Sequence, residues 1–600
     1  MQVGRPISGD DLVDLLRVTG PLPRRLVAVM APGELLEELE RGELLVAAVD
    51  DDVVELGPRA GTAAVSGLRR RRLLAVVATA LEDEPLGRVA PDVAVRVASA
   101  VVEVGGRSRD PLVRGIRAAL VLGQMDEAAR LAAHARTMFV DDLEVAHLVA
   151  MTYEATGRHG SATAVMAGIK SDPASLGRWW SNLFLSFRGE GVVPDISGIG
   201  DQHNELLANQ AWIEIVAGDV AAVARSTTTI LNDPASSPQA VVWACVAGAM
   251  AAALDGRADV VVRLFEHAEQ IVAAAPEWLT PFAPLQLDLV RFLSDVRLGH
   301  IVAACEFADA RIAAASSTFL ASVWQAMSGL ALRECGQFDE GLARLSASLP
   351  AFTGDNFGLI TWAHSEARVC HAMAGVGPPD EQRLEPMGLY SACVERNAAW
   401  VLAAAGDVAA AMVRLDASFE QARQLGQNVV ALLAAVDIAR FGEPRRAASL
   451  LTDITEQRAP LMEVGSHAVL AFSSTDVPTI VRAYDGAQRL GLEPLASELG
   501  LWARRSTSTA GPAAARVELR TEVRVAPTPR LAAAAPAGLR YLTAREHEIG
   551  RLAATRATSR QIADELEVSV RTVDNLLGRV YQKCGVGNRN ELSAVLAATG

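Results

Sequence analysis

A repeated pattern of apolar and polar positions divides most of the chain into pairs of helices. Apolar residues at helical spacing run up to a glycine, a polar residue follows, and a second helix begins with small residues. Glycine suits this turn because it adopts the left-handed conformation without the penalty of a Cβ atom. The pattern turns at Gly123, Gly157, Gly218, Gly256, Gly299, Gly336, Gly406 and Gly442, with a weaker copy at Gly375.

Most of these glycines follow one another at intervals of about 34 to 43 residues. Helix, glycine turn and helix at this period are typical of tetratricopeptide-like arrays. Residues 86–503 resemble such an array, and we predict a tetratricopeptide-like superhelix there. Within it, Gly189 and Gly191 form a lone G-x-G that we interpret as an ordinary loop. The array offers a surface for a peptide, a protein or a small effector, or it is a rigid scaffold, and the sequence nominates no residue on it.

Residues 1–85 follow a different pattern. Short helical stretches precede two apolar runs that flank an Asp50–Asp52 turn, and an Arg69–Arg72 run leads into a further helix. Helices, a hairpin and a helix are typical of a small winged-helix-like module. The stretches "GPLPRRLVAVM" and "LLEELERGELL" resemble the winged-helix piece of the large ATP-binding regulators of the LuxR family. We interpret the arginine run as a solvated helix face rather than as a DNA contact.

Composition limits the class of protein. The chain has 600 residues, of which 50% are hydrophobic and 21% are charged, and these values indicate several folded domains. No apolar run is long enough to cross a bilayer, and the first residues lack the apolar segment of a signal peptide. We therefore predict a cytoplasmic protein without membrane contact. The six cysteines form no CxxC pair, which favours buried thiols over a metal site.

The sequence lacks the motifs of P-loop ATPases, serine hydrolases and zinc proteases. A nucleotide-binding P-loop needs Gly-Lys-Ser/Thr, but neither of the two lysines, Lys170 and Lys583, follows a glycine. The G-x-S-x-G elbow of serine hydrolases is missing. Arg551 stands where a zinc protease motif that starts at His547 would need its second histidine. We predict a protein that is not an enzyme and that needs no cofactor and no metal.

The composition changes beyond Trp502. Residues 504–538 are rich in Ala, Pro, Thr and Arg and lack helical periodicity, so we predict a flexible linker. This linker contains six arginines and two glutamates, and residues 540–600 contain nine basic and seven acidic residues. Because the net charge of the whole chain is -15, the acidic excess lies in residues 1–503. Residues 539–600 are therefore an electrostatically distinct segment.

Four short helices with tight turns are predicted within residues 539–600. Thr543 and Glu546 are spaced as a capping box for the first helix, residues 559–566 form the second, and Ser569 caps the third. At 100° per residue, the apolar positions of the third helix fall on one face. They are Val570, Val573, Leu576, Leu577, Val580, Tyr581 and Cys584.

The opposite face of the third helix carries side chains that read DNA bases. Arginine pairs with guanine, asparagine pairs with adenine, and aspartate accepts a hydrogen bond from cytosine. A glycine within a helix costs about 1 kcal/mol relative to alanine, and close approach of the backbone to a DNA groove would explain it. We predict base contacts from Arg571, Asp574, Asn575 and Gly578.

Residues 541–598 closely resemble the LuxR-type helix-turn-helix domain. The matching residues are Leu542, Thr543, Arg545, Glu546, Ile562, Ala563, Leu566, Val568, Ser569, Thr572, Val573, Val580, Tyr581, Lys583, Gly585, Val586, Arg589, Glu591 and Leu592. The sequence departs at Arg556, Leu576 and Cys584, where the family favours Gly, His and Leu. The resemblance implies that residues 570–584 are the recognition helix. It also implies phosphate contacts from Ser559, Arg560, Thr572 and Lys583, to which we add the flanking Arg579.

These patterns together predict an all-α protein: a tetratricopeptide-like superhelix, a C-terminal four-helix LuxR-type helix-turn-helix domain and a small N-terminal winged-helix-like module. The predicted function is that of a bacterial transcriptional regulator that binds double-stranded DNA and receives a signal or partner on its body. The family implies a homodimer on DNA, with contacts through Leu592, Val595 and Leu596. The alternative is a helical-repeat interaction scaffold whose C-terminal domain no longer binds DNA.

Overall fold

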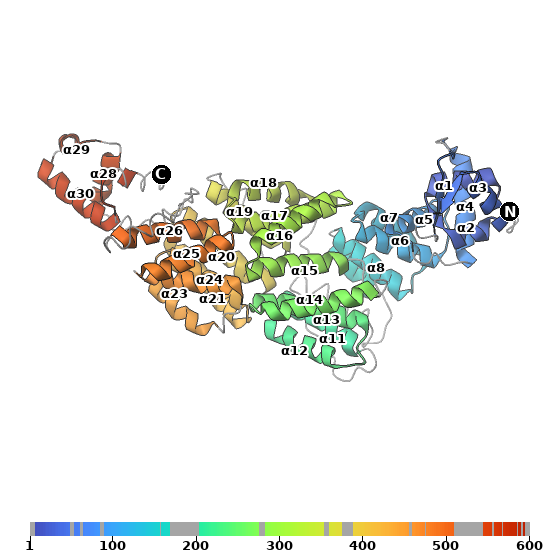
Figure 1. The fold of residues 1–600 in the computed structure, drawn as a ribbon, viewed down its shortest axis with the longest axis horizontal. Coiled ribbons are helices and arrows are strands. Elements are labelled where there is room, and N and C mark those ends of the chain that lie inside the picture. Colours follow the sequence, from blue (N-terminus) through green and yellow to red (C-terminus); the bar gives the residue numbers. More distant parts are fainter. Residues whose placement is uncertain are drawn as a thin grey trace.

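The computed structural model describes residues 7–47, 53–60, 64–83, 89–156, 158–167, 203–274, 283–352, 359–374, 388–454, 459–474, 476–508, 544–554, 557–566, 568–584, 586–589 and 592–593. Most of them are helical (Figure 1). Their buried apolar residues form three clusters, one within residues 7–165, one within 206–503 and one within 549–592. The first cluster continues across residue 85, and the domain limits given above stay predictions.

The N-terminal part mixes helices and strands. Its elements are α1 (Gly9–Thr19), β1 (Leu22–Pro23), α2 (Arg24–Met30), α3 (Gly33–Arg41), β2 (Leu45–Ala47), β3 (Val53–Leu56) and α4 (Gly67–Asp83). The strands form an antiparallel sheet in the order β1-β3-β2, with Leu22 opposite Val54 and Val46 opposite Glu55.

Two of these strands, β2 and β3, are the apolar runs that were expected on either side of Asp50–Asp52, although the aspartates themselves lie outside the described residues. The all-α fold class is therefore wrong for this part of the chain. Strand β1 was not predicted because its two residues are too few to show an alternating pattern. It lies at the edge of the sheet, where Pro23 is tolerated although it has no N–H group.

The body consists of successive helices joined by short turns. They are α5 (Pro91–Glu103), α6 (Arg109–Val121), α7 (Met125–Met138), α8 (Leu143–Ala155), α9 (His159–Ala167), α11 (His203–Ala217), α12 (Val220–Asn232), α13 (Pro238–Leu254), α14 (Ala258–Ala274), α15 (Ala283–Leu298), α16 (Ile301–Ala313), α17 (Thr318–Glu334), α18 (Phe338–Ser348), α19 (Leu359–Ala374), α20 (Gly388–Ala404), α21 (Val408–Gln424), α22 (Asn428–Arg440), α23 (Pro444–Leu450), α24 (Pro460–Ser473), α25 (Val477–Arg489) and α26 (Glu493–Ser508). Two 3-10 turns, Leu349–Ala351 and Leu451–Asp453, follow α18 and α23. Each helix packs mainly against its neighbours in sequence, which confirms the tetratricopeptide-like body (Figure 1).

The glycine turns were predicted correctly wherever the structure describes them. Their φ angles are positive, between 66° and 115°. These glycines are Gly123, Gly218, Gly256, Gly299, Gly336, Gly406 and Gly442. The turns expected at Gly157 and Gly375, and the loop with Gly189 and Gly191, lie outside the described residues.

Two stretches of the body that are far apart in sequence pack against each other. Helices α11, α13 and α15 contact α20, α22 and α24, respectively. A Cβ atom at Gly256, after α13, would overlap the Met462 side chain of α24. Across the same contact, the Asn428 side-chain amide donates to an Asp255 carboxylate oxygen at 2.6 Å. The glycine turns therefore serve both the local helix pairs and the contact between distant repeats.

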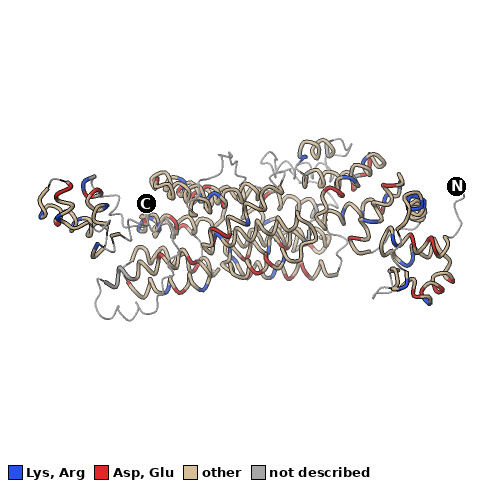
Figure 2. The backbone as a smooth tube through the Cα atoms, turned by 90° about the horizontal axis from the view of Figure 1, so that it is seen from above, with Lys and Arg blue, Asp and Glu red and all other residues tan. Residues whose placement is uncertain are grey.

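No described helix is long and apolar enough to cross a membrane. Acidic and basic positions are distributed along the whole length of the body (Figure 2).

Gly256→Ala is expected to destabilise the body more than Gly406→Ala. Both glycines have positive φ, 79° and 88°, so each substitution costs about 1–2 kcal/mol of backbone strain. Only at Gly256 does the new Cβ atom also meet a side chain, because nothing lies within 4 Å of the Gly406 position. Melting temperatures of the two variants test this expectation. Gly160→Ala, on α9 with open space around it, is the control that should leave the melting temperature unchanged or slightly raised. An equal decrease in melting temperature for Gly256→Ala and Gly406→Ala would show that the Met462 contact does not contribute to stability.

Candidate nucleic-acid interface

The C-terminal residues form a small helical unit with its own core. Its described helices are α28 (Ala544–Ala554), α29 (Ser559–Glu565) and α30 (Val570–Cys584), and they lie as a separate group beyond α26 (Figure 1). The buried residues are Ile549, Leu552, Ala553, Ile562, Ala563, Val573, Leu577, Val580 and Leu592. The first three of the four expected helices are confirmed.

Side-chain caps fix where α29 and α30 begin. The Thr558 hydroxyl accepts from the Gln561 amide at 3.3 Å, and the Gln561 side chain accepts from the Thr558 amide at 2.8 Å. This capping box was missed, although a Thr-x-x-Gln pattern is a local signal that would have found it. The Ser569 hydroxyl accepts from the Thr572 amide at 3.1 Å, so the predicted cap of α30 is confirmed. The cap expected at Thr543 lies outside the described residues.

The segment after α30 ties the unit together. The Arg589 guanidinium donates to the Ser559 hydroxyl at 2.7 Å and to the Ala557 carbonyl, so it holds the turn between α28 and α29. The Leu592 amide bonds to the Asn588 carbonyl at 3.0 Å, as in a helical turn, but most of the fourth helix lies outside the described residues. The Leu592 side chain is 0% exposed within this core. It is therefore not available for the dimer contact that the family resemblance implied.

The apolar face of α30 is largely the one predicted. Val573, Leu577 and Val580 are buried, and Leu576 and Tyr581 are partly buried against the core. Val570 was expected inside but is 42% exposed, because it lies in the first turn, ahead of the residues that pack on α28 and α29. The Cys584 side chain lies outside the described residues.

The polar face of α30 is open to solvent. Arg571, Asp574, Asn575, Gly578 and Arg579 are all exposed. A Cβ atom at the Gly578 position would have nothing within 4 Å, so the protein fold itself does not require this glycine. The four residues predicted to contact bases thus share one free face of a single helix.

The residues predicted to contact phosphates lie around this face. Ser559 and Arg560 begin α29, and Thr572 lies in the first turn of α30. Arg560 and Thr572 are exposed, and Ser559 is partly buried. Lys583 is in the last turn of α30, but its side chain lies outside the described residues. The arrangement is a helix pair whose second member presents its polar face, as a groove-binding helix-turn-helix does.

Residues 540–596 match the family model described as "Bacterial regulatory proteins, luxR family". The chain carries a LuxR-family helix-turn-helix domain. The match covers α28, α29, α30 and the residues around Arg589, which are the elements that make the buried core of the domain. No curated protein matches the chain.

Two solved structures are similar to the chain at low identity. One is a Signal Transduction ATPase with Numerous Domains (STAND) protein with a tetratricopeptide repeat sensor from Pyrococcus horikoshii, with 10% identity and a TM-score of 0.21. The match covers 82% of this chain and 65% of that protein. The other is yeast Tom70, with 10% identity and a TM-score of 0.23, where the match covers 75% of this chain and 96% of Tom70. The assignment of the body rests on its own helix pairs rather than on these scores.

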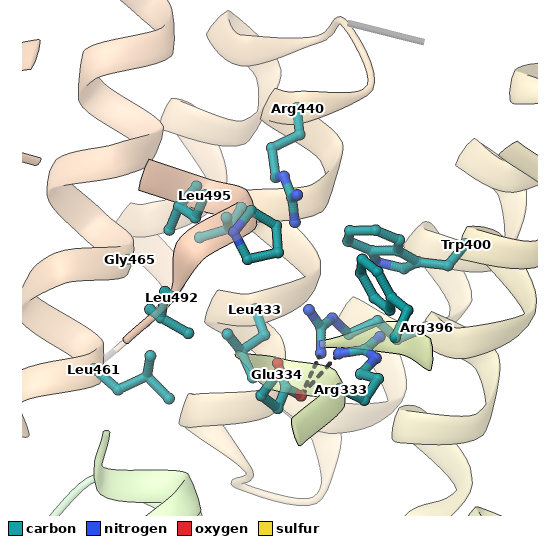
Figure 3. Close-up of a pocket in the computed structure, with 13 residues that line it drawn as sticks. Arg333, Glu334, Arg396, Trp400, Leu433, Arg440, Leu461, Gly465, Leu492 and Leu495 are labelled. Atoms are coloured by element: carbon teal, nitrogen blue, oxygen red, sulfur yellow. Dashed lines mark hydrogen bonds and ion pairs between the residues drawn. The ribbon is translucent and has the colours of Figure 1, made fainter. Parts of the chain in front are cut away.

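Outside the LuxR-type domain, buried charges line a small cavity between α17, α18, α20, α22, α24 and α26 (Figure 3). Asp437 on α22 is 0% exposed and accepts from Arg396 at 2.6 Å, from Arg440 at 3.0 Å and from the Trp400 indole at 2.7 Å. Such pairing is required because an unpaired charge inside a protein is strongly destabilising.

Glu334 lies between Arg333 and Arg396, at 2.9 and 3.4 Å, on the charged wall of this cavity (Figure 3). The apolar wall consists of Leu433, Val436, Leu461, Leu492 and Leu495. The cavity volume is about 40 Å³. That is room for a few water molecules, whereas ligand pockets measure about 300–1,000 Å³. The cavity is therefore part of the packed contact between α17, α20, α22, α24 and α26, and we assign no ligand to it.

Glu334 makes the stability of the body sensitive to acid. Burial alone would raise the pKa of Glu334, but Arg333, Arg396 and Arg297 lower it to about 2 from an ordinary value of 4.5. Since the pKa is lower in the folded state, the stabilisation is complete above about pH 4.5 and is lost as the pH falls towards 2. Glu334→Gln should flatten the decline of the melting temperature in this window. Glu266→Gln, at an exposed position of α14, should leave that decline as it is, and a similar effect of both variants would contradict the assignment.

Gly578→Ala should stabilise α30 by up to about 1 kcal/mol, because alanine is the better helix former and its Cβ atom has open space. Hydrogen exchange of the α30 amides in the full chain measures this effect, with slower exchange expected in the variant. Arg571→Ala, at an exposed position of the same helix, is the control and should change exchange little. Faster exchange in Gly578→Ala would show that the fold, and not a partner, requires the glycine.

Proposed function

We propose that this chain is a bacterial transcriptional regulator that binds double-stranded DNA sequence-specifically through α30 of its LuxR-type domain. The exposed polar face of α30 carries the proposal. A helix that buries Val573, Leu577 and Val580 and leaves Asp574 and Asn575 in solvent can enter a major groove without losing its own packing.

Each predicted contact has a chemical reason in the proposal. The side chains of Arg571, Asp574 and Asn575 offer the donors and acceptors that distinguish base pairs, and Gly578 lets the α30 backbone approach the groove. Phosphates are held by Ser559, Arg560, Thr572, Arg579 and Lys583. The Ser559 hydroxyl accepts its hydrogen bond from Arg589, so its own proton remains to be donated to a phosphate oxygen.

The N-terminal part is proposed to be winged-helix-like, from its element order of helix, strand, two helices and two strands. Two residues of its arginine run form ion pairs within the protein. Arg69 pairs with Asp11 and Asp14 at 3.2 and 2.9 Å, and Arg70 pairs with Glu103 at 3.0 Å. These ion pairs favour a structural role for Arg69 and Arg70 over a DNA contact.

The proposal also includes the partner of the body, the oligomeric state and the location of the protein. The tetratricopeptide-like body receives a peptide, a protein or a small effector, and the LuxR-type domain binds DNA as a homodimer in the cytoplasm, where bacterial DNA lies. Because Leu592 is buried in its own domain, the dimer contact is made by other residues.

Asn575→Ala is expected to weaken binding to a preferred DNA site by about 1–3 kcal/mol, or roughly 5- to 150-fold in the dissociation constant, because a bidentate base contact is lost. The preferred site is selected with the full chain from random duplexes, and affinities are measured by fluorescence anisotropy at fixed salt.

Arg560→Ala is the matched control for this test. This variant should have a lower affinity for all duplexes alike, since it removes a phosphate contact. The slope of the logarithm of the binding constant against the logarithm of the salt concentration should become shallower by about 1. An unchanged affinity of Asn575→Ala would contradict the base contact. If the unmodified chain shows no salt-sensitive binding to any duplex, the interaction-scaffold alternative is favoured.

A further inference from the structure

Two cysteines meet at one end of a helix pair in the body. Cys305 lies in the second turn of α16, and Cys335 directly follows the last residue of α17. Each of the two thiols influences the ionisation of the other. Cys335 is 7% exposed, whereas Cys305 is partly exposed. A reagent in solution can therefore reach Cys305, and Cys335 stands directly behind it.

A third element borders this thiol pair. A Cβ atom at Gly491, in the turn between α25 and α26, would lie 3.8 Å from the Cys335 sulfur and 2.9 Å from a methyl carbon of Val302. Val302 lies one helical turn before Cys305 on α16. The two thiols are thus situated where α16, the end of α17 and the start of α26 converge.

The charges around the pair favour Cys305 as the reacting thiol. The neighbouring Cys335 side chain lowers the pKa of Cys305, and Arg344 lowers it further against burial and the carboxylates of Asp309 and Glu306. The pKa of Cys335 is raised, first by the neighbouring Cys305 side chain and then by burial. Since the thiolate is the nucleophile, Cys305 attacks first.

The other described cysteines differ from this pair. Burial raises the pKa of Cys245 and of Cys370 to about 12. The thiol of Cys393 is buried and accepts a hydrogen bond from Arg297 at 3.0 Å. Among the described residues, only Cys305 joins partial exposure to a neighbouring thiol.

We propose that Cys305 and Cys335 form a reversible disulfide when the protein reacts with a hydroperoxide such as hydrogen peroxide. The Cys305 thiolate attacks one peroxide oxygen, so that an S–O bond forms, the O–O bond breaks and hydroxide leaves as water after taking up a proton. The Cys335 sulfur then attacks the Cys305 sulfur, the S–S bond forms, the S–O bond breaks and a second water leaves. The two thiols are oxidised and the peroxide is reduced. This proposal goes beyond the proposed function and does not rest on it.

A disulfide here would join α16 covalently to the end of α17, which packs against α26, the last helix of the body. Gly336, next to Cys335, lies against Pro494 in the first turn of α26. Helix α26 is the last described helix before the LuxR-type domain, and its end, up to Ser508, overlaps the first residues of the predicted linker. The thiol pair is therefore placed beside the helix that joins the body to the DNA-binding end of the chain.

The test counts thiols in the full chain. The native protein is treated with hydrogen peroxide, then unfolded in N-ethylmaleimide and weighed by mass spectrometry. The untreated chain should carry six maleimide groups, one for each cysteine. The oxidised chain should carry two fewer, dithiothreitol should restore them, and peptide mapping should join the peptides that contain Cys305 and Cys335.

Three variants separate the roles of the thiols. Cys305→Ser should abolish the loss of maleimide groups, and Cys335→Ser should leave a sulfenic acid on Cys305 that dimedone traps. Cys370→Ser is the matched control at a buried cysteine and should still lose two groups. Unchanged maleimide labelling of the oxidised chain, or a disulfide that uses Cys584 of another molecule instead, would overturn the proposal. These readouts do not depend on DNA, so they stay separate from the test of the proposed function.

Discussion

The body depends on a backbone conformation that only glycine adopts without strain. Each described glycine turn has positive φ, which reverses the chain between paired helices. At Gly256 and Gly336 the absence of a side chain is needed a second time, because Met462 and Pro494 from distant repeats fill the space where a Cβ atom would be. Glycine is therefore required at these two positions both by the backbone conformation of the turn and by the side chain packed against it. These turns link the local helix pairs to the contact between distant repeats.

The packing of α17, α20, α22 and α26 buries several charged side chains. Arg333, Arg396 and Arg440 extend from three different helices towards Glu334, Asp437 and Glu498, and each of these arginines has a carboxylate within 3.0 Å. Arg440 and Arg333 also lie over the Trp400 ring, 4.5 and 5.3 Å from its centre. Desolvation makes these pairs costly to break, although it makes them weak as a source of net stability. Their role is to fix how α17, α20, α22 and α26 pack, since another register would leave buried charges unpaired.

Features set by residues close together in the sequence could be predicted, whereas contacts between residues far apart in the sequence could not. The described glycine turns, the cap at Ser569 and most of the buried face of α30 follow from spacing within a few residues, and these were predicted correctly. The partnership of Arg440 with Glu498 could not be foreseen, because it joins residues of different repeats and each looks like a polar position on its own helix. Val570 was wrongly placed inside because periodicity does not show where a helix passes the edge of its neighbours. Strand β1 was missed because two residues carry no period.

The net charge of -15 does not decide whether the LuxR-type domain binds DNA. Electrostatic interactions between exposed charges are largely screened beyond about 8 Å at physiological salt. The 35 residues of the predicted linker would span about 30–36 Å as a flexible chain, so a domain held at that distance experiences little of the field of the acidic body. In the proposed function, Arg560 and Arg579, which are exposed on the domain itself, would then hold phosphates. If the body approaches the domain to within a few ångströms, its acidic excess opposes DNA. The distance between body and domain therefore sets how strongly the acidic excess of the body would oppose DNA.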